Sequence, residues 1–84
     1  MVAVRLAIDA QEDFDALPPT MRARMLGVFQ RLQQWPNVSG AKALRGDWTG
    51  HYRIRTGDWR VIFQVVAPTV IVVRIKHRSE VYEG

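Results

Sequence analysis

Arginines alternate with other residues in the second half of this 84-residue chain, and a histidine and a tyrosine follow near the C-terminus. Arg53, Arg55 and Arg60 carry guanidinium groups, which can each donate two parallel hydrogen bonds to phosphate oxygens. His77 is a candidate acid or base, because histidine ordinarily titrates near neutral pH. Tyr82 is a candidate for base stacking or proton transfer. These residue types suffice for RNA cleavage by the RNA's own 2′-hydroxyl, which needs an acid, a base and cations around the phosphorane.

Several other kinds of site can be excluded from the sequence. The chain contains no cysteine, no Gly-rich phosphate loop and no zinc-ligand spacing. No serine lies in a recognisable Ser–His–Asp motif, and the acidic residues form no obvious catalytic pair. The two histidines, His51 and His77, make a weak metal site on their own. We therefore expect chemistry that uses neither a metal ion nor a cofactor.

The net charge of +4 is unevenly distributed along the chain. Residues 1–41 hold equal numbers of acidic and basic side chains, whereas Asp47 and Asp58 are the only acids of residues 42–78. The basic residues of that second segment are Lys42, Arg45, Arg53, Arg55, Arg60, Arg74, Lys76 and Arg78. Such asymmetry is typical of a surface that binds a polyanion. Beside the three arginines named above, the predicted RNA-binding residues are Lys42, Arg45, Lys76 and Arg78.

The length and composition predict one domain that spans residues 1–84. No apolar run is long enough to cross a membrane, so no membrane association is expected. The apolar N-terminus is too short, and too soon followed by acidic residues, to be a signal peptide. The absence of cysteine agrees with a cytoplasmic protein.

Each candidate residue also has a structural interpretation. Arg60 can pair with Asp58 or Asp47, and Arg53 and Arg55 can protect an exposed strand edge through their charge. His77 can serve only as a hydrogen-bond partner of the backbone, and Tyr82 can fix the C-terminus onto the sheet. His51, at the entrance of a predicted strand, is a second candidate for proton transfer. The residues alone leave these interpretations open.

A strand is predicted over residues 2–8, where apolar residues alternate with small or polar ones. Asp9 follows as a predicted N-cap, and Glu12 stands three residues later in the capping-box position. The resulting helix is expected to run to about residue 17, where two consecutive prolines end it.

A second helix is predicted over residues 19–35, because its apolar residues recur at helical spacing. It begins either with Thr20 as its N-cap or with Pro19 in its first turn. The two helices are expected to form an antiparallel hairpin. Residues 37–40 then form a loop, and residues 41–46 approach the sheet in an extended conformation.

Three consecutive antiparallel strands are predicted over residues 52–55, 59–66 and 70–76, which are rich in β-branched and aromatic residues. Gly57 supplies the positive φ that the first, short connection needs. The last strand is almost continuously apolar, so we expect it to lie inside the sheet. The tail from residue 78 is long enough for one helical turn.

These elements define an α+β fold: an N-terminal strand, a helical hairpin, and a three-stranded antiparallel meander. The helices cover one face of the sheet, which leaves the opposite face for the arginines. Strand alternation places Arg53 and Arg55 on that face, and Tyr52 and Ile54 on the other.

The hairpin of residues 52–62 and the His-Arg-x-x-Val-Tyr ending of residues 77–82 resemble the RelE-like toxins of bacterial toxin–antitoxin systems. Residues 44–46 and the segment ALPPTMRARML of residues 16–26 fit the same family, so the resemblance covers nearly the whole chain. The hairpin and the ending are its most specific parts. The resemblance implies a RelE-like fold.

The resemblance also implies a ribosome-dependent endonuclease that cleaves mRNA in the ribosomal A site without a metal ion. A cognate antitoxin would bind the toxin and block it. The basic positions of the family correspond to Arg53, Arg55 and Arg60, and continue with Lys76 and Arg78. The C-terminal tyrosine of the family corresponds to Tyr82. Members with the His-Arg ending place the histidine, here His77, in the site.

This sequence departs from some relatives, which have lysine at the hairpin positions and a glutamate base nearby. An arginine stays protonated near neutral pH, so Arg53 and Arg55 are read as charge stabilisers, and proton transfer is left to His77 or Tyr82. Two alternatives belong to other classes. One is a gyrase poison like the ParE toxins, which share the RelE architecture, and the other is an RNA- or ribosome-binding module without catalysis.

Overall fold

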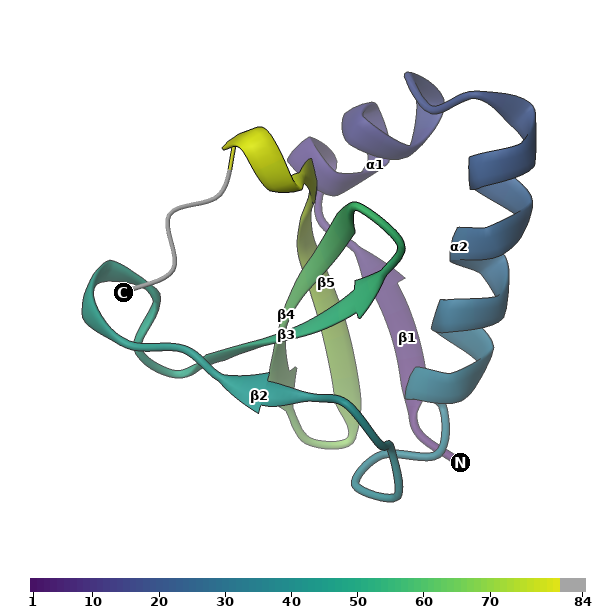
Figure 1. Cartoon of the computed structure of the whole chain (residues 1–84). Coiled ribbons are helices and arrows are strands. Elements are labelled where there is room, and N and C mark those ends of the chain that lie inside the picture. Colours follow the sequence, from purple (N-terminus) through teal and green to yellow (C-terminus); the bar gives the residue numbers. More distant parts are fainter. Residues whose placement is uncertain (81–84) are drawn as a thin grey trace.

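The computed structural model describes residues 1–80, in which two helices pack against a five-stranded mixed sheet (Figure 1). The elements are β1 (Ala3–Leu6), α1 (Ile8–Asp15), α2 (Pro19–Leu32), β2 (Lys42–Ala43), β3 (His51–Thr56), β4 (Trp59–Val66) and β5 (Thr69–His77), with 3₁₀ turns η1 (Gly46–Trp48) and η2 (Arg78–Glu80). The strand order is β1-β5-β4-β3-β2, with β1 parallel to β5 and all other pairs antiparallel.

The predicted α+β fold and the β3–β4–β5 meander are confirmed, and β5 lies inside the sheet as expected. Two strands complete the sheet at its edges. The N-terminal strand β1 pairs with β5, and the extended approach predicted for residues 41–46 contains the two-residue strand β2. Neither helix described in residues 1–80 is long and apolar enough to span a membrane.

The helix boundaries differ in detail from those predicted. Asp9 is not the N-cap of α1: the cap position is Ala7, which makes no side-chain cap, and Asp9 lies in the first turn. There its carboxylate still faces the positive end of the helix dipole. Pro19 occupies the first turn of α2, as predicted, and Thr20 is not the cap. Both helices end two to three residues early, in turns that begin before Pro18 and Pro36.

The core lies between the helices and the sheet. Met25, Val28 and Leu32 recur along one side of α2 and are fully or almost fully buried against Phe63 and its neighbours. The buried core residues are Ala10, Leu17, Met25, Val28, Leu32, Ile54, Val61, Phe63, Val70, Val72 and Ile75. All the strand residues in this set point toward the helices, so the other face of the sheet is not needed for the main core.

A β-bulge in β5 adjusts which side chains reach each face. Ile62 is paired with Arg74 but the next residue, Phe63, is paired with Val72, so Val73 is an extra residue. Without this bulge Arg74 would share the face of the buried Val72. With it, Ile75 returns to the core and the cations beyond Val73 reach the opposite face.

The turn between β3 and β4 depends on a glycine. Gly57 has a φ of 59°, and a Cβ built there would lie 3.0 Å from Nη1 of Arg24. We expect Gly57→Ala to lower the free energy of unfolding by about 1 kcal/mol, because an L-residue is strained at positive φ. Gly27→Ala is the matched control. Gly27 lies in α2 with nothing within 4 Å of the added Cβ, so this change should stabilise by about 0.5–1 kcal/mol. Urea denaturation of both variants measures the difference, and equal effects would contradict this account of the turn.

Asp13 of α1 takes the place of a strand partner for β5 beyond the point where β1 ends. The pairing of β1 with β5 stops at Leu6 and Val72, and the Ile75 amide donates instead to Oδ2 of Asp13 at 2.9 Å. Arg74 donates to the same carboxylate from Nε (2.8 Å, Oδ2) and from Nη2 (3.1 Å, Oδ1). This bidentate arrangement fixes α1 against β5.

The environment of Asp13 makes stability depend on pH. Burial raises the pKa of this carboxyl, but the hydrogen bonds from Arg74 and Ile75 and the charges of Arg74 and Lys76 outweigh it, so the pKa lies below its ordinary value. A depressed pKa in the folded state means that the ionised carboxylate contributes stability above the unfolded pKa of about 3.9.

We therefore expect the contribution of Asp13 to be complete near neutral pH and to disappear as the pH falls through the folded pKa. Urea denaturation of the wild-type chain and of Asp13→Asn at several pH values between about 2 and 7 measures it. The stability difference between the two should shrink on the acid side. A difference that grows or stays constant toward low pH would contradict this assignment.

Candidate nucleic-acid interface

The register of the sheet brings cations from three strands into rows on the face away from the core. Arg55 of β3 is paired with Arg60 of β4, and Arg60 is paired with Lys76 of β5. In the adjacent row Lys42 of β2 is paired with Arg53 of β3. Because paired residues point to the same face, these side chains form one surface. We call the surface formed by Lys42, Arg53, Arg55, Arg60 and Lys76 the basic face.

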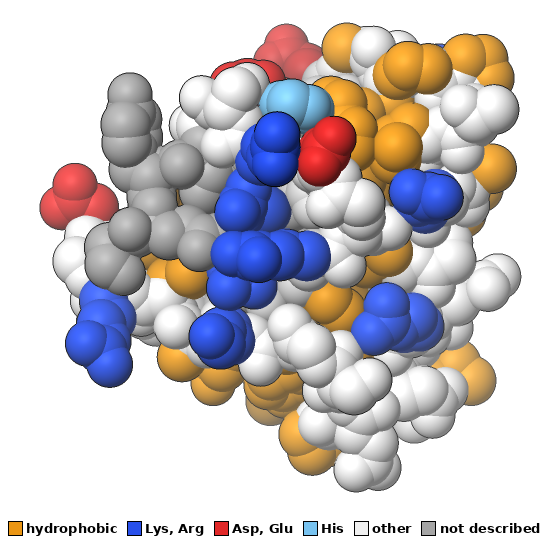
Figure 2. Space-filling view, viewed as in Figure 1, with side chains coloured by type: hydrophobic (Ala, Val, Ile, Leu, Met, Phe, Trp, Pro, Cys, Tyr) orange, Lys and Arg blue, Asp and Glu red, His pale blue; other side chains and the backbone are white. Residues whose placement is uncertain are grey.

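Figure 2 shows Lys and Arg side chains gathered in a column over the middle of the molecule, with a histidine at the upper end of the column. Strands lie about 4.8 Å apart, so the row Arg55–Arg60–Lys76 spans roughly 10 Å. Like charges that face each other across strands repel, and an anion that bridges them relieves this repulsion. The row is therefore suited to a phosphodiester backbone.

The members of the basic face differ in exposure. Arg53 is only 8% exposed, and Arg60 and Lys76 are half-buried, whereas Arg55 and Lys42 are exposed. The three arginines also interact with other groups of the chain. The burial of Arg53 restricts the movement of its side chain, as a preorganised electrostatic site requires.

The predicted face assignment of β3 is confirmed. Tyr52 packs on the helix side, where its ring stacks on that of Phe63 at 5.6 Å and meets the edge of Trp35 at 4.9 Å. Ile54 is a core residue. Arg53 and Arg55 consequently leave β3 on the opposite side.

Two other predicted RNA-binding residues lie beside the sheet rather than on it. Arg45 immediately precedes η1, and Arg78 begins η2 just beyond β5. Both side chains are exposed. The Arg78 amide donates to the Asp58 carbonyl at 2.8 Å, and its Nε lies 3.8 Å from Oδ1 of Asp58. This exposed ion pair is worth little energy, so Arg78 remains available to an anion.

His77 belongs to the strand row that faces the helices. Its register partner is Trp59, and the two rings meet edge to face with centroids 5.3 Å apart. Nδ1 of His77 accepts a hydrogen bond from the Ser79 amide at 3.3 Å and lies 2.9 Å from the Ser79 hydroxyl. Because Nδ1 is an acceptor, the proton of the neutral ring is on Nε2. His77 therefore makes a hydrogen bond to the backbone, as expected if its role is structural rather than catalytic.

His51 alternates with Arg53 and Arg55 along β3, which places it on the side of the basic face. Its ring meets that of Trp48 edge to face at 5.3 Å. Its Nδ1 is buried and has no hydrogen-bond partner among the described residues. A buried ring nitrogen without a partner is uncommon, and His51 stays the second candidate for proton transfer that the sequence proposed.

Tyr82 lies outside the described residues. Among residues 1–80, no group of three or more His, Asp or Glu side chains could hold a metal ion.

Sequence reasoning missed the pairing of Arg74. Arg74 is one of the basic residues of segment 42–78, but its side chain is bound to Asp13 of α1. No local signal predicts this pair, because the two residues are 61 positions apart. The sequence also gave no indication that Trp59 and Glu80 line one pocket.

The fold is a small mixed sheet with helices on one face and cations on the other, and comparison with known proteins shows the family to which the chain belongs. Residues 4–82 match the family described as ParE toxin of type II toxin-antitoxin system, parDE. Toxin RelG of Mycobacterium tuberculosis is 30% identical over 82 residues, which cover 94% of this chain and 93% of that protein. The chain therefore belongs to the RelE/ParE superfamily of type II toxin–antitoxin toxins.

Solved structures agree with this assignment. The toxin–antitoxin complex RelBE2 of Mycobacterium tuberculosis contains a chain that is 25% identical, with a TM-score of 0.80 and coverage of 92% of this chain and 98% of that one. The archaeal RelE–RelB complex of Pyrococcus horikoshii OT3 gives a TM-score of 0.77 at 25% identity, with coverage of 95% and 98%.

Proposed function

We propose that this toxin is a ribosome-dependent endonuclease that cleaves mRNA in the ribosomal A site. The observation that carries the proposal is the row Arg55–Arg60–Lys76, which crosses three strands on the face away from the core. Likeness to RelG and to RelE-containing complexes supports it. The 2′-hydroxyl of the RNA attacks the adjacent phosphorus, and the bond to the 5′-oxygen of the next nucleotide breaks.

The cations have an electrostatic role in this reaction. Arg55, Arg60 and Lys76 hold the scissile phosphate and stabilise the negative charge that develops in the transition state. Arg53, which is almost completely buried, supports this surface from the neighbouring row. Lys42, Arg45 and Arg78 contact the flanking backbone.

Proton transfer is assigned to other residues, because a guanidinium remains protonated at neutral pH. His77 lies in the row that faces the helices, at the end of β5 next to Lys76, so it can serve a phosphate only at that end of the basic face. There it would donate Nε2–H, since its Nδ1 is engaged by Ser79. His51 is the alternative on the basic-face side. A role for Tyr82 in base stacking or proton transfer is supported only by the family resemblance. The proposed partners are the ribosome, mRNA and a cognate antitoxin, which places the protein in the cytoplasm.

We infer an antitoxin partner from the relatives, two of which were solved as toxin–antitoxin complexes. An acidic antitoxin segment that covers the basic face would neutralise it and exclude mRNA. The gene beside that of this chain is expected to encode such a protein.

The deciding experiment adds the purified chain to ribosomes programmed with a defined mRNA and maps the cleaved ends, with the same naked mRNA as the control. Cuts in the A-site codon that require ribosomes would support the proposal. Folded protein that cuts neither sample would overturn it.

A gyrase poison is the second candidate, because the matching family is described by its ParE toxins. The two functions differ in which process stops first after expression is induced. Incorporation of labelled thymidine and of labelled methionine, measured together, separates them. Loss of thymidine incorporation before methionine incorporation, with inhibition of supercoiling by purified gyrase, would establish the ParE-type function instead.

A further inference from the structure

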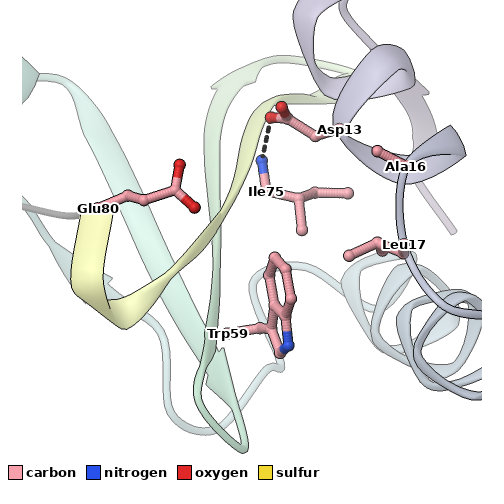
Figure 3. Close-up of a pocket in the computed structure, with 6 residues that line it drawn as sticks. All are labelled: Asp13, Ala16, Leu17, Trp59, Ile75 and Glu80. Atoms are coloured by element: carbon pink, nitrogen blue, oxygen red, sulfur yellow. Dashed lines mark hydrogen bonds between the residues drawn. The ribbon is translucent and has the colours of Figure 1, made fainter.

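A pocket of about 230 Å³ lies on the helix side of the sheet, where α1, the start of β4 and η2 meet. Its lining residues are Asp13, Ala16, Leu17, Trp59, Ile75 and Glu80. Figure 3 shows α1 on one side and Glu80 on the other, with Ile75 and the ring of Trp59 between them. The pocket thus combines an aliphatic wall, an aromatic ring and a carboxylate at its rim.

Two carboxylates, those of Asp13 and Glu80, line this pocket, and Arg74 interacts electrostatically with both. Asp13 is neutralised by Arg74 at 2.8 Å, and Arg78 is near Asp58. Within residues 1–80, the Glu80 carboxylate has no ion pair or hydrogen bond, and it is exposed at the rim. The adjacent helix α1 has the sequence IDAQEDFD, which contains four carboxylates and no cation.

These features fit a side chain with an apolar stem and a cationic head. The methylenes of an arginine or lysine can pack on Leu17 and Ile75 while the charged group reaches Glu80 and the ring of Trp59. The volume is sufficient for one such side chain but not for a segment of chain. An RNA base is a poorer match, because its phosphates would approach the carboxylates of α1.

We propose that this pocket receives an arginine or lysine side chain from a protein partner, and that the partner is the inhibitory antitoxin. Only the identity of the partner rests on the proposed function. The antitoxin segment would then be acidic where it crosses the basic face and basic where it crosses α1. This opposite charge pattern fixes the direction in which the segment lies on the toxin.

The test titrates the ¹⁵N-labelled chain with the peptide N-acetyl-Gly-Arg-Gly-amide and follows its amide and indole resonances by NMR. We expect saturable shifts at the Trp59 indole, Ala16 and Ile75, with a dissociation constant of roughly 1–10 mM for so small a ligand. The same peptide with norleucine in place of arginine should cause no saturable shift.

Two variants and a nucleotide complete the test. Glu80→Gln should weaken the binding of the arginine peptide about fivefold, whereas Glu12→Gln, an exposed acid of α1 outside the pocket, should change it less than about twofold. Guanosine monophosphate is the probe for an RNA base. Shifts of the pocket resonances by the nucleotide and not by the peptide would overturn the proposal, as would peptide shifts that are diffuse or unaffected by Glu80→Gln. The titration uses neither ribosomes nor RNA, so its outcome is separate from that of the cleavage experiment.

Discussion

Arg60→Ala is expected to cut mRNA on programmed ribosomes about 100-fold more slowly than the wild-type chain. Arg60 lies at the centre of its row, with Arg55 on one side and Lys76 on the other. A phosphate bound to this row therefore contacts Arg60 whether it also contacts Arg55 or Lys76. Removing this guanidinium therefore removes the charge nearest to the phosphorane.

Two further variants show whether the loss of activity in Arg60→Ala comes from the charge at this position, from its bidentate geometry or from a general effect of removing an arginine. Arg31→Ala removes an exposed arginine near the end of α2, where its side chain donates to the Ser39 carbonyl, and should change the cleavage rate by less than about threefold. Arg60→Lys keeps the charge but loses the bidentate fork, and should retain about a tenth of the activity. Urea midpoints equal to that of the wild type would show that the variants are folded. Wild-type cleavage by folded Arg60→Ala would contradict the role of the basic face.

Asp13→Ala is expected to lower the free energy of unfolding by about 2 kcal/mol, because it removes three hydrogen bonds and leaves Arg74 without its carboxylate. For a chain of this length, the melting temperature should fall by about 10 °C. This is a large fraction of the stability of so small a protein.

The matched control is Asp15→Ala, since Asp15 is exposed on the same helix and accepts one hydrogen bond, from Gln11 at 3.0 Å. It should cost no more than about 0.5 kcal/mol. Thermal unfolding followed by circular dichroism measures both variants. Equal melting temperatures for the two would show that α1 is not held to β5 through Asp13.

The sequence predicted those parts of the fold that depend on local patterns. A segment rich in β-branched and aromatic residues identified β4 with its observed ends, and helical spacing identified α2. Gly57 has the positive φ that the hairpin turn was predicted to need. The basic face followed from alternation in β3, because no irregularity interrupts that strand.

The features that were not predicted depend on contacts between distant segments. The bulge at Val73 has no local signature, since a run of valines before Arg74 is equally compatible with a regular strand. The parallel pairing of β1 with β5 joins the two ends of the chain. The pocket beside Trp59 is built from three segments, none of which is unusual alone.

The basic face and the acidic helix α1 lie in different parts of the molecule and contribute opposite ends of an electric dipole, which the three arginines of α2 on the helix side make smaller. The positive end of this dipole is the basic face, and its negative end includes the acidic helix α1. In the field of a large polyanion such a dipole experiences a torque, so the molecule turns toward its target before contact. The fraction of encounters that are productive rises, and it falls again when salt screens the field over about 10 Å. If the chain acts on RNA as proposed, the acids of α1 thus help to orient it toward that polyanion.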